Sequence, residues 1–158
     1  MSVIDASPAA RPPLRGNDVR LRPARFVDCL DVYRWNFAPD VRAQSTTHAV
    51  VSLCDHTQWF SRRLRSVDPI WIVEEDRQAI GVVRLDREAT GARISIALAA
   101  AARGRQIGRR AIELACRAAP TVIAEVATDN TASQKCFEAC GFTQADRTPD
   151  RITYRWSA

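Results

Sequence analysis

The sequence predicts an α/β protein in which a mixed sheet carries helices on both faces. Segments with the alternation of strands interleave with segments whose apolar residues recur at helical spacing. No internal repeat or interdomain linker interrupts this order, and 158 residues suffice for one domain with a substantial core. We therefore expect residues 18–158 to form a single domain, preceded by a proline-rich flexible tail over residues 1–17.

The expected elements follow one another in a regular order. They are a strand at 19–22, a helix ended by Pro39, a helix from Ser52, strands at 70–73, 79–85 and 94–98, a helix at 106–117, a strand at 121–126, a helix from Asn130 to Cys140 and a strand at 152–156. Ser52 with Asp55 resembles a capping box, Asn130 is a suitable N-cap, and Gly141 suits the left-handed position after a helix. The residues expected to face inward are Phe26, Leu30, Tyr33 and Phe37 in the first helix, Leu53, His56, Phe60 and Leu64 in the second, and Ile107, Ala111, Leu114 and Ala115 in the third.

Composition excludes several classes of function. The net charge is +5, but the basic residues are scattered arginines with one lysine and no nucleic-acid motif, so we expect no nucleic-acid partner. No apolar run approaches the roughly 20 residues of a membrane helix, and the N-terminus does not resemble a signal peptide, so a cytoplasmic location is the default expectation. Five cysteines without a C-x-x-C pair, together with two histidines, predict no metal site. The sequence leaves the oligomeric state open, a homodimer included.

The most informative segment is the glycine-bearing turn from Arg103 to Gly108. It lies between an expected strand and an expected helix, where backbone N–H groups at the positive end of the helix dipole are ready for a phosphate. Arg103, Arg105 and Arg109 add charged donors. The turn is neither a P-loop nor a dinucleotide fingerprint, so alone it predicts only a phosphorylated ligand.

Two blocks in this half of the chain resemble the GCN5-related N-acetyltransferase (GNAT) family. The turn Arg103-x-x-Gln106-x-Gly108 is similar to the family's R/Q-x-x-G-x-G/A, with Gln106 in place of a glycine. A side chain is admissible there if the backbone stays in the right-handed helical region. The stretch from Asn130 to Phe142 is similar to N-x-x-A-x-x-x-Y/F-x-x-x-G-F. The resemblance extends from about Val19 to Phe142 and implies the GNAT fold, a mixed and mostly antiparallel sheet.

The resemblance also implies acetyl-CoA as the cofactor, with its pantetheine arm between two splayed strands. The residues that it implies for cofactor binding are Leu98, Arg103, Gly104, Arg105, Gln106, Ile107, Gly108, Arg109, Asn130 and Phe137. Backbone amides beside Leu98 would polarise the thioester carbonyl.

Members of the family with this arrangement take a proton from the attacking amine with a glutamate on the strand before the Asn block. Glu125 stands there, and its apolar neighbours suggest a burial that would raise its pKa. The alternative is that Glu125 pairs with an arginine. The family's usual acid, a tyrosine, is Phe137 here, so that position cannot deliver a proton.

The N-terminal half carries a narrower resemblance. Its three blocks are Trp35-x-x-x-Pro39-Asp40-Val41-Arg42-x-x-Ser45, then Val51-Ser52-Leu53-x-Asp55-His56-x-x-Trp59-Phe60, then Val83-Arg84-Leu85-Asp86. They look like blocks of acetyltransferases that act on nucleotide-linked 4-amino sugars of pseudaminic-acid-type pathways. That likeness implies an anionic nucleotide sugar as the small-molecule amine acceptor, held by Arg42, His56, Trp59 and Arg84. Core packing is the alternative for Trp35, Trp59, Phe60 and His56. An acetyltransferase for a protein N-terminus or small amine and a non-catalytic acetyl-CoA-binding module are the alternative functions.

Overall fold

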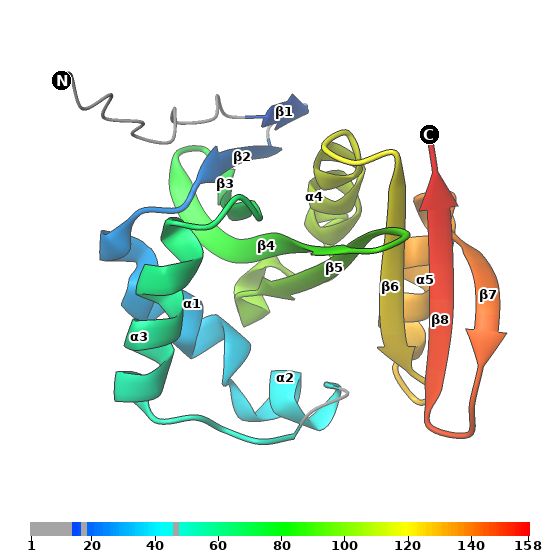
Figure 1. Cartoon of the computed structure of the whole chain (residues 1–158), viewed down its shortest axis with the longest axis horizontal. Helices are drawn as coiled ribbons and strands as arrows, with labels where there is room; N and C mark the ends of the chain where they lie inside the picture. The colour runs from blue at the N-terminus through cyan, green and yellow to red at the C-terminus, as the bar shows by residue number, and fades with distance from the viewer. Residues whose placement is uncertain (1–13, 17–18, 46–47) are drawn as a thin grey trace, which may run out of the picture.

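The computed structural model describes residues 14–16, 19–45 and 48–158. In this part of the chain, eight strands form one sheet and helices pack against it (Figure 1). The strands are β1 (Leu14–Gly16), β2 (Val19–Pro23), β3 (Ile70–Glu75), β4 (Gln78–Glu88), β5 (Gly91–Leu98), β6 (Thr121–Ala127), β7 (Thr143–Arg147) and β8 (Arg151–Ser157). The helices are α1 (Cys29–Asn36), α2 (Pro39–Ala43), α3 (Leu53–Leu64), α4 (Ile107–Cys116) and α5 (Thr131–Ala139), with 3₁₀ helices η1 (Phe26–Asp28) and η2 (Ala100–Ala102). None of the described helices has the length and apolar character that crossing a bilayer requires.

The sheet is mixed and mostly antiparallel, as predicted. Its strand order is β1-β2-β3-β4-β5-β6-β8-β7, and every neighbouring pair is antiparallel except β5 and β6. The two parallel strands pair only where Ala92 lies opposite Val122 and Arg93 opposite Ile123. Beyond these residues the strands diverge (Figure 1), so residues 94–98 and 124–127 are not paired with each other.

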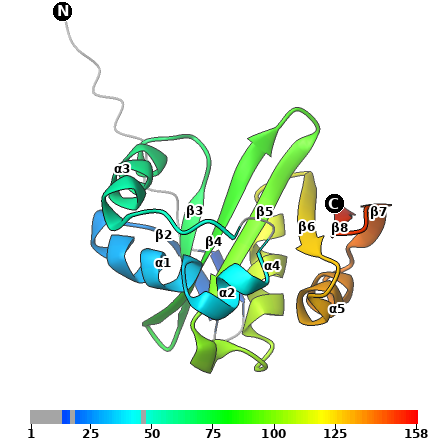
Figure 2. The same cartoon turned by 90° about the horizontal axis from the view of Figure 1, so that it is seen from below.

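Two apolar cores lie on opposite faces of the sheet, which confirms the prediction of helices on both. In β3, Trp71 joins the first core and Ile72 the second, because successive side chains of a strand point to opposite faces. Helix α4 covers the first core with its inward residues, all of them buried as predicted: Ile107, Ala111, Leu114 and Ala115. Helices α1 and α3 lie side by side over the second core, where Val32 and Phe60 are fully buried (Figures 1 and 2).

The inward faces of the first two helices differ from the prediction. Phe26 and Leu30 are 57% and 43% exposed, and Cys29 and Val32 point inward instead. The chain enters α1 through η1, whose tighter three-residue repeat shifts the phase of the side chains that face the core. Leu53 is also exposed, at 46%, because it is the first residue of α3.

The sequence did not predict β1, α2 or β7. Pro39 was expected to end a helix, but α1 ends at Asn36 and Pro39 starts α2, where its fixed φ suits the first helical position. Strand β1 lies within the expected tail and pairs with β2, whereas residues 1–13 lie outside the described residues. Strand β7 has five exposed residues, so it carries no apolar alternation that would indicate a strand.

The predicted N-caps Ser52 and Asn130 and the left-handed Gly141 are confirmed, although Asp55 does not complete a capping box. Ser52 accepts a hydrogen bond from the Asp55 amide at 3.0 Å, and its hydroxyl donates to the Asp55 carboxylate at 2.7 Å. Asn130 accepts from the amide of Ser133 at 3.1 Å. Gly141 has the left-handed φ of 86° expected after a helix.

A buried group of charges joins the sheet to η1. Arg22 on β2 contacts Glu74 on β3 at 2.5 Å and Asp28 at 2.6 Å, and both carboxylates are almost fully buried. Arg20 completes the group through an ion pair with Glu74. Burial alone would raise the pKa of Asp28, but hydrogen bonds from Arg22 and from the Arg25 amide outweigh it and lower that pKa.

Candidate active site

A cavity of about 1480 Å³ opens where β5 and β6 diverge. It extends from the start of α4 and the adjacent face of α5 to the segment that contains α2 and α3. The residues predicted for the site line this cavity, except Arg105 and Ile107. They are Arg42, His56, Trp59, Arg84, Leu98, Arg103, Gly104, Gln106, Gly108, Arg109, Glu125, Asn130 and Phe137.

The turn before α4 has an unusual backbone. Gly104 has φ of 70°, and Gln106 has φ of 62° and ψ of 8°, so both are left-handed. The right-handed condition for a side chain at this position is therefore not met, and Gln106 adopts a conformation that favours glycine. The first backbone bond of the helix is donated by Arg110 to the Gln106 carbonyl, so the amides of Ile107, Gly108 and Arg109 have no intrahelical partner. This turn can present several N–H groups to one anion.

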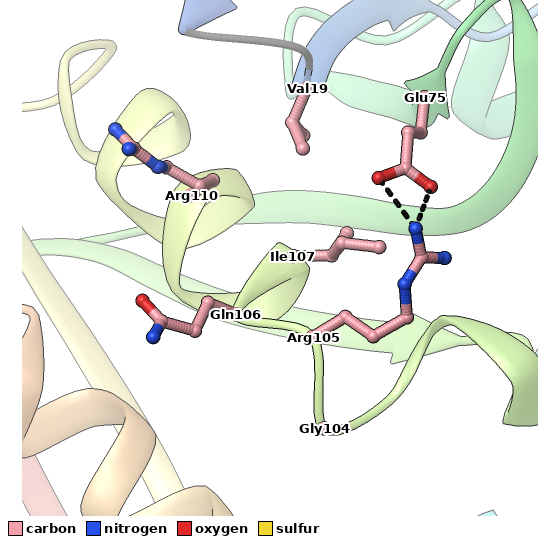
Figure 3. A pocket seen from close by; sticks show the side chains of 7 residues that line it. All are labelled: Val19, Glu75, Gly104, Arg105, Gln106, Ile107 and Arg110. Atoms are coloured by element: carbon pink, nitrogen blue, oxygen red, sulfur yellow. Dashed lines mark hydrogen bonds and ion pairs between the residues drawn. The ribbon is translucent and has the colours of Figure 1, made fainter.

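The arginines of the turn are paired with carboxylates. Arg103 contacts Asp40 on α2 and donates to the Leu98 carbonyl at 3.1 Å. Arg105 contacts Glu75 at 2.8 Å at the edge of a separate hollow of about 420 Å³, which also holds Ile107. Figure 3 shows Arg105 reaching both oxygens of Glu75, whereas the Gln106 side chain lies on the other side of the turn.

Arg109 pairs with Glu113 at 2.9 Å along α4, and that ion pair raises the pKa of Arg109. The side chains of Arg103, Arg105 and Arg109 are nonetheless 40%, 54% and 46% exposed, so an incoming phosphate can compete for them. The turn therefore fits the pyrophosphate of a CoA molecule through its amides and the two cations that line the cavity, Arg103 and Arg109.

The middle of the cavity fits an extended amide-bearing chain. Residues 94–98 of β5 and 124–127 of β6 present backbone groups that the other strand does not pair. Leu98 also stands close to the start of α4, since its Cδ1 lies 3.5 Å from the position that a β-carbon on Gly108 would occupy. Phe137 is 5% exposed and packs edge-to-face on Phe142, so it lines the cavity as a core residue.

Glu125 lies on the cavity wall, but not in the apolar surroundings expected from its neighbours in sequence. Its carboxylate contacts Arg151 of β8 at 2.9 Å and Arg93 of β5 at 3.3 Å. Both guanidinium groups contact the same carboxylate oxygen, Oε2. The contacts therefore favour the ion-pairing role that the sequence left open. They also link β6 to β5 and β8 just past the last residues at which β5 and β6 pair.

The far end of the cavity is aromatic. His56 is 2% exposed and stands among Tyr33, Phe37, Trp59 and Phe60, with ring centroids 5.1 to 5.9 Å away. Its Nε2 lies 3.0 Å from the Cys29 carbonyl. Burial lowers the pKa of His56, partly opposed by this hydrogen bond, so the ring is neutral at physiological pH.

Two arginines flank this aromatic group. The Arg42 guanidinium stacks on Phe37 at 5.0 Å, and that of Arg84 stacks on Trp59 at 5.3 Å. Burial lowers the pKa of Arg42, and the charge of Arg84 lowers it further. Burial also lowers the pKa of Arg84, although an ion pair with Asp86 at 3.3 Å opposes that shift. Two partly desolvated cations thus stand close enough to repel each other, and an anion bound between them would relieve that repulsion.

Sequence reasoning missed several of these residues. Phe37 was expected only as an inward-facing core residue and Asp40 was noted only within a motif block, although each contacts a predicted arginine. Arg93 could have been found from the alternation of β5, which places it on the face of the sheet opposite the buried Ala92 and Ile94. The contact of Arg151 with Glu125 could not be predicted from the sequence, because it depends on the antiparallel pairing of β8 with β6.

Comparison with solved structures finds the same fold in several acetyltransferases. A spermidine N-acetyltransferase from Vibrio cholerae, in complex with CoA and spermine, superposes with a TM-score of 0.79 at 16% identity over 90% of this chain and 96% of that one. The putative acetyltransferase YncA from Salmonella typhimurium, with its cofactor acetyl-CoA, gives 0.71 at 19% identity over 89% and 94%. RimJ from Mycobacterium smegmatis, in complex with CoA-disulfide, gives 0.72 at 19% identity over 93% and 86%.

Sequence comparison identifies the family. No curated protein sequence matches the chain significantly. The model of the acetyltransferase (GNAT) domain matches residues 18–143, which is most of the chain and includes both the turn before α4 and α5. The protein therefore belongs to the GNAT family of acetyltransferases.

Proposed function

We propose that the protein transfers the acetyl group of acetyl-CoA to the amine of a nucleotide-linked amino sugar. The donor half of this proposal is supported by the turn before α4, whose amides and arginines suit a pyrophosphate. Two of the similar structures were solved with CoA or acetyl-CoA, which agrees with the same donor.

The acceptor half depends on one observation, the pair of stacked arginines at the far end of the cavity. Arg42 and Arg84 offer two cations to a diphosphate, and the faces of Trp59 and Phe37 hold the guanidinium groups in place. Of the nearby carboxylates, Asp40 pairs with Arg103 and Asp86 pairs with Arg84 at 3.3 Å, whereas Asp55 accepts a hydrogen bond from the neutral Ser52 hydroxyl. The local charge therefore favours an anionic acceptor over a polyamine.

The test is release of CoA thiol with a panel of amines: a UDP-linked 4-amino-4,6-dideoxy sugar, an N-terminal peptide and spermidine. We expect the highest kcat/KM for the nucleotide sugar. Arg84→Gln removes a hydrogen bond to a charged group, which is worth about 1.5–3 kcal/mol, so kcat/KM for the sugar should fall about 10- to 150-fold. The matched control is Arg34→Gln on the outer side of α1, where the arginine is 66% exposed and no change is expected.

The other outcomes separate the remaining functions. Turnover of the peptide or of spermidine alone would reject the nucleotide sugar and indicate a different amine acetyltransferase. Acetyl-CoA binding without turnover of any amine would contradict the proposal and indicate a binding module.

A further inference from the structure

His56 is the titratable side chain most enclosed by the acceptor end of the cavity. It contacts the Cys29 carbonyl and the Tyr33 ring of α1 from its position on α3. These two helices lie side by side (Figures 1 and 2). Four aromatic rings surround it, and it is 2% exposed although it lines the cavity. A polar side chain in such surroundings is costly unless its hydrogen-bonding groups are used.

The hydrogen bond to Cys29 fixes the tautomer of the ring. A backbone carbonyl can only accept, so Nε2 carries the proton and donates it to the Cys29 oxygen at 3.0 Å. Nδ1 then holds a lone pair. Within the described part of the chain it has no hydrogen-bond partner, and the His56 side chain lines the cavity. The lone pair is thus available to a molecule in the cavity.

The two groups that the family would use for proton transfer are changed or ion-paired here. Glu125 is held by Arg93 and Arg151, and Phe137 has no hydroxyl group. Cys136 also lines the cavity, but beside Gly108 at the end that suits the pyrophosphate. His56 is the neutral nitrogen base at the opposite end, next to the stacked arginines.

We propose that His56 is the catalytic base and that its Nδ1 accepts a proton from the acceptor amine. During the transfer a bond forms between the amine nitrogen and the acetyl carbon, the carbon–sulfur bond breaks, and its electron pair leaves with sulfur. The proton lost by nitrogen goes to Nδ1 and then, through solvent, to the thiolate, which leaves an amide, a thiol and a neutral imidazole. This inference rests on the proposed placement of the acceptor at this end of the cavity.

The charges around His56 agree with this role. Tyr33 of α1 donates its hydroxyl to the Val51 carbonyl at 3.0 Å, and Asp55 of α3 is bound to Ser52. Arg42 stacks on Phe37 and Arg84 on Trp59, two of the rings that contact the imidazole. Their cations do not favour a protonated ring, and an anionic acceptor bound to them would stabilise the imidazolium as it forms.

The first experiment compares pH–rate profiles of wild type, His56→Gln and Glu125→Gln, with whichever amine of the panel the wild type acetylates. The glutamine amide can donate to the Cys29 carbonyl as Nε2 does, but it has no basic nitrogen. We expect kcat of His56→Gln to fall about 100- to 10,000-fold and its acidic limb to disappear, with unchanged acetyl-CoA affinity. Glu125→Gln should retain the acidic limb. An acidic limb that persists in His56→Gln, or that disappears only in Glu125→Gln, overturns the proposal.

A second measurement does not depend on turnover. The chain has two histidines, His48 and His56, so ¹⁵N spectra of the imidazoles can be assigned by loss of one set of signals in His56→Gln. We expect His56 to be protonated on Nε2 and to titrate below the ordinary histidine pKa of 6.5. A proton on Nδ1 at neutral pH would remove the lone pair and refute the proposal. Rejection of the nucleotide sugar by the amine panel affects neither experiment, so the two proposals fail separately.

Discussion

Gln106→Gly is the substitution that tests most directly how the cofactor turn is built. Gln106 is held at φ of 62°, and a left-handed conformation costs a residue with a β-carbon about 1–2 kcal/mol. Glycine adopts this φ freely but loses more entropy on folding, by about 0.5–1 kcal/mol. The difference predicts a net stabilisation of about 0.5–1 kcal/mol, which for a chain of this length raises Tm by about 1–4 °C.

The matched control is Gln106→Ala. The Gln106 side chain makes no capping hydrogen bond, so its truncation removes little. Alanine keeps the β-carbon and therefore the backbone strain, so its Tm should stay close to that of the wild type. Thermal unfolding of the three proteins at one pH, with urea unfolding as a second method, separates the backbone effect from the side-chain effect.

Backbone strain at position 106 is refuted if Gln106→Gly and Gln106→Ala have the same Tm, or if Gln106→Gly has the lower Tm. Either result would mean that the left-handed conformation carries no strain that glycine relieves. Because glycine holds the same conformation, we also expect calorimetric titration to show that Gln106→Gly keeps its affinity for acetyl-CoA. A large loss of affinity would indicate that the glutamine side chain itself contacts the cofactor.

Three further predictions concern stability. Arg22→Met leaves Glu74 and Asp28 buried without their shared cation and should destabilise the protein by about 3–5 kcal/mol in urea unfolding; a loss below 1 kcal/mol would contradict the buried network. Burial lowers the pKa of His56, so the imidazole binds a proton more tightly in the unfolded chain than in the folded protein. The Tm of the wild type should therefore fall as the pH drops below about 6.5, and the Tm of His56→Gln should fall less over the same pH range. Ser52→Ala should cost about 1 kcal/mol through loss of the N-cap of α3, whereas an unchanged stability would exclude the cap.

Local chemistry explains why much of the fold could be predicted. Asn130 and Ser52 each accept a hydrogen bond from a backbone amide three residues away, and Gly141 adopts a left-handed φ. These features depend on residues close in sequence, so the sequence predicts these helix caps. The inward face of α4 was also correct, because one long periodic segment packs against one side of the sheet.

The errors have a different physical origin. The surroundings of Glu125 are set by Arg93 and Arg151, which lie 32 and 26 residues away and arrive through strand pairing. The left-handed φ of Gln106 depends on the turn that connects η2 to α4, and a glutamine at this position does not indicate a left-handed conformation. Phe26 and Leu30 had the right spacing for a buried stripe, but η1 set a different phase. Tertiary contacts decide each of these features, and periodicity does not report them.

The arginine pair has a consequence for acceptor choice that follows from charge alone. The spermidine N-acetyltransferase shares this fold at 16% identity, so the backbone frame does not select the acceptor and the side chains must. Two unit charges about 6 Å apart interact by about 3 kcal/mol at an effective dielectric constant of about 20. A polyamine amine near either Arg42 or Arg84 would meet that repulsion, whereas a phosphate would gain a comparable attraction. One such contact corresponds to about 100-fold in kcat/KM, so spermidine should be disfavoured by at least this factor relative to an anionic amine of similar size. Arg84→Gln should narrow the gap from both sides, by weakening the anionic acceptor and improving spermidine, a reciprocal change that loss of packing alone would not produce.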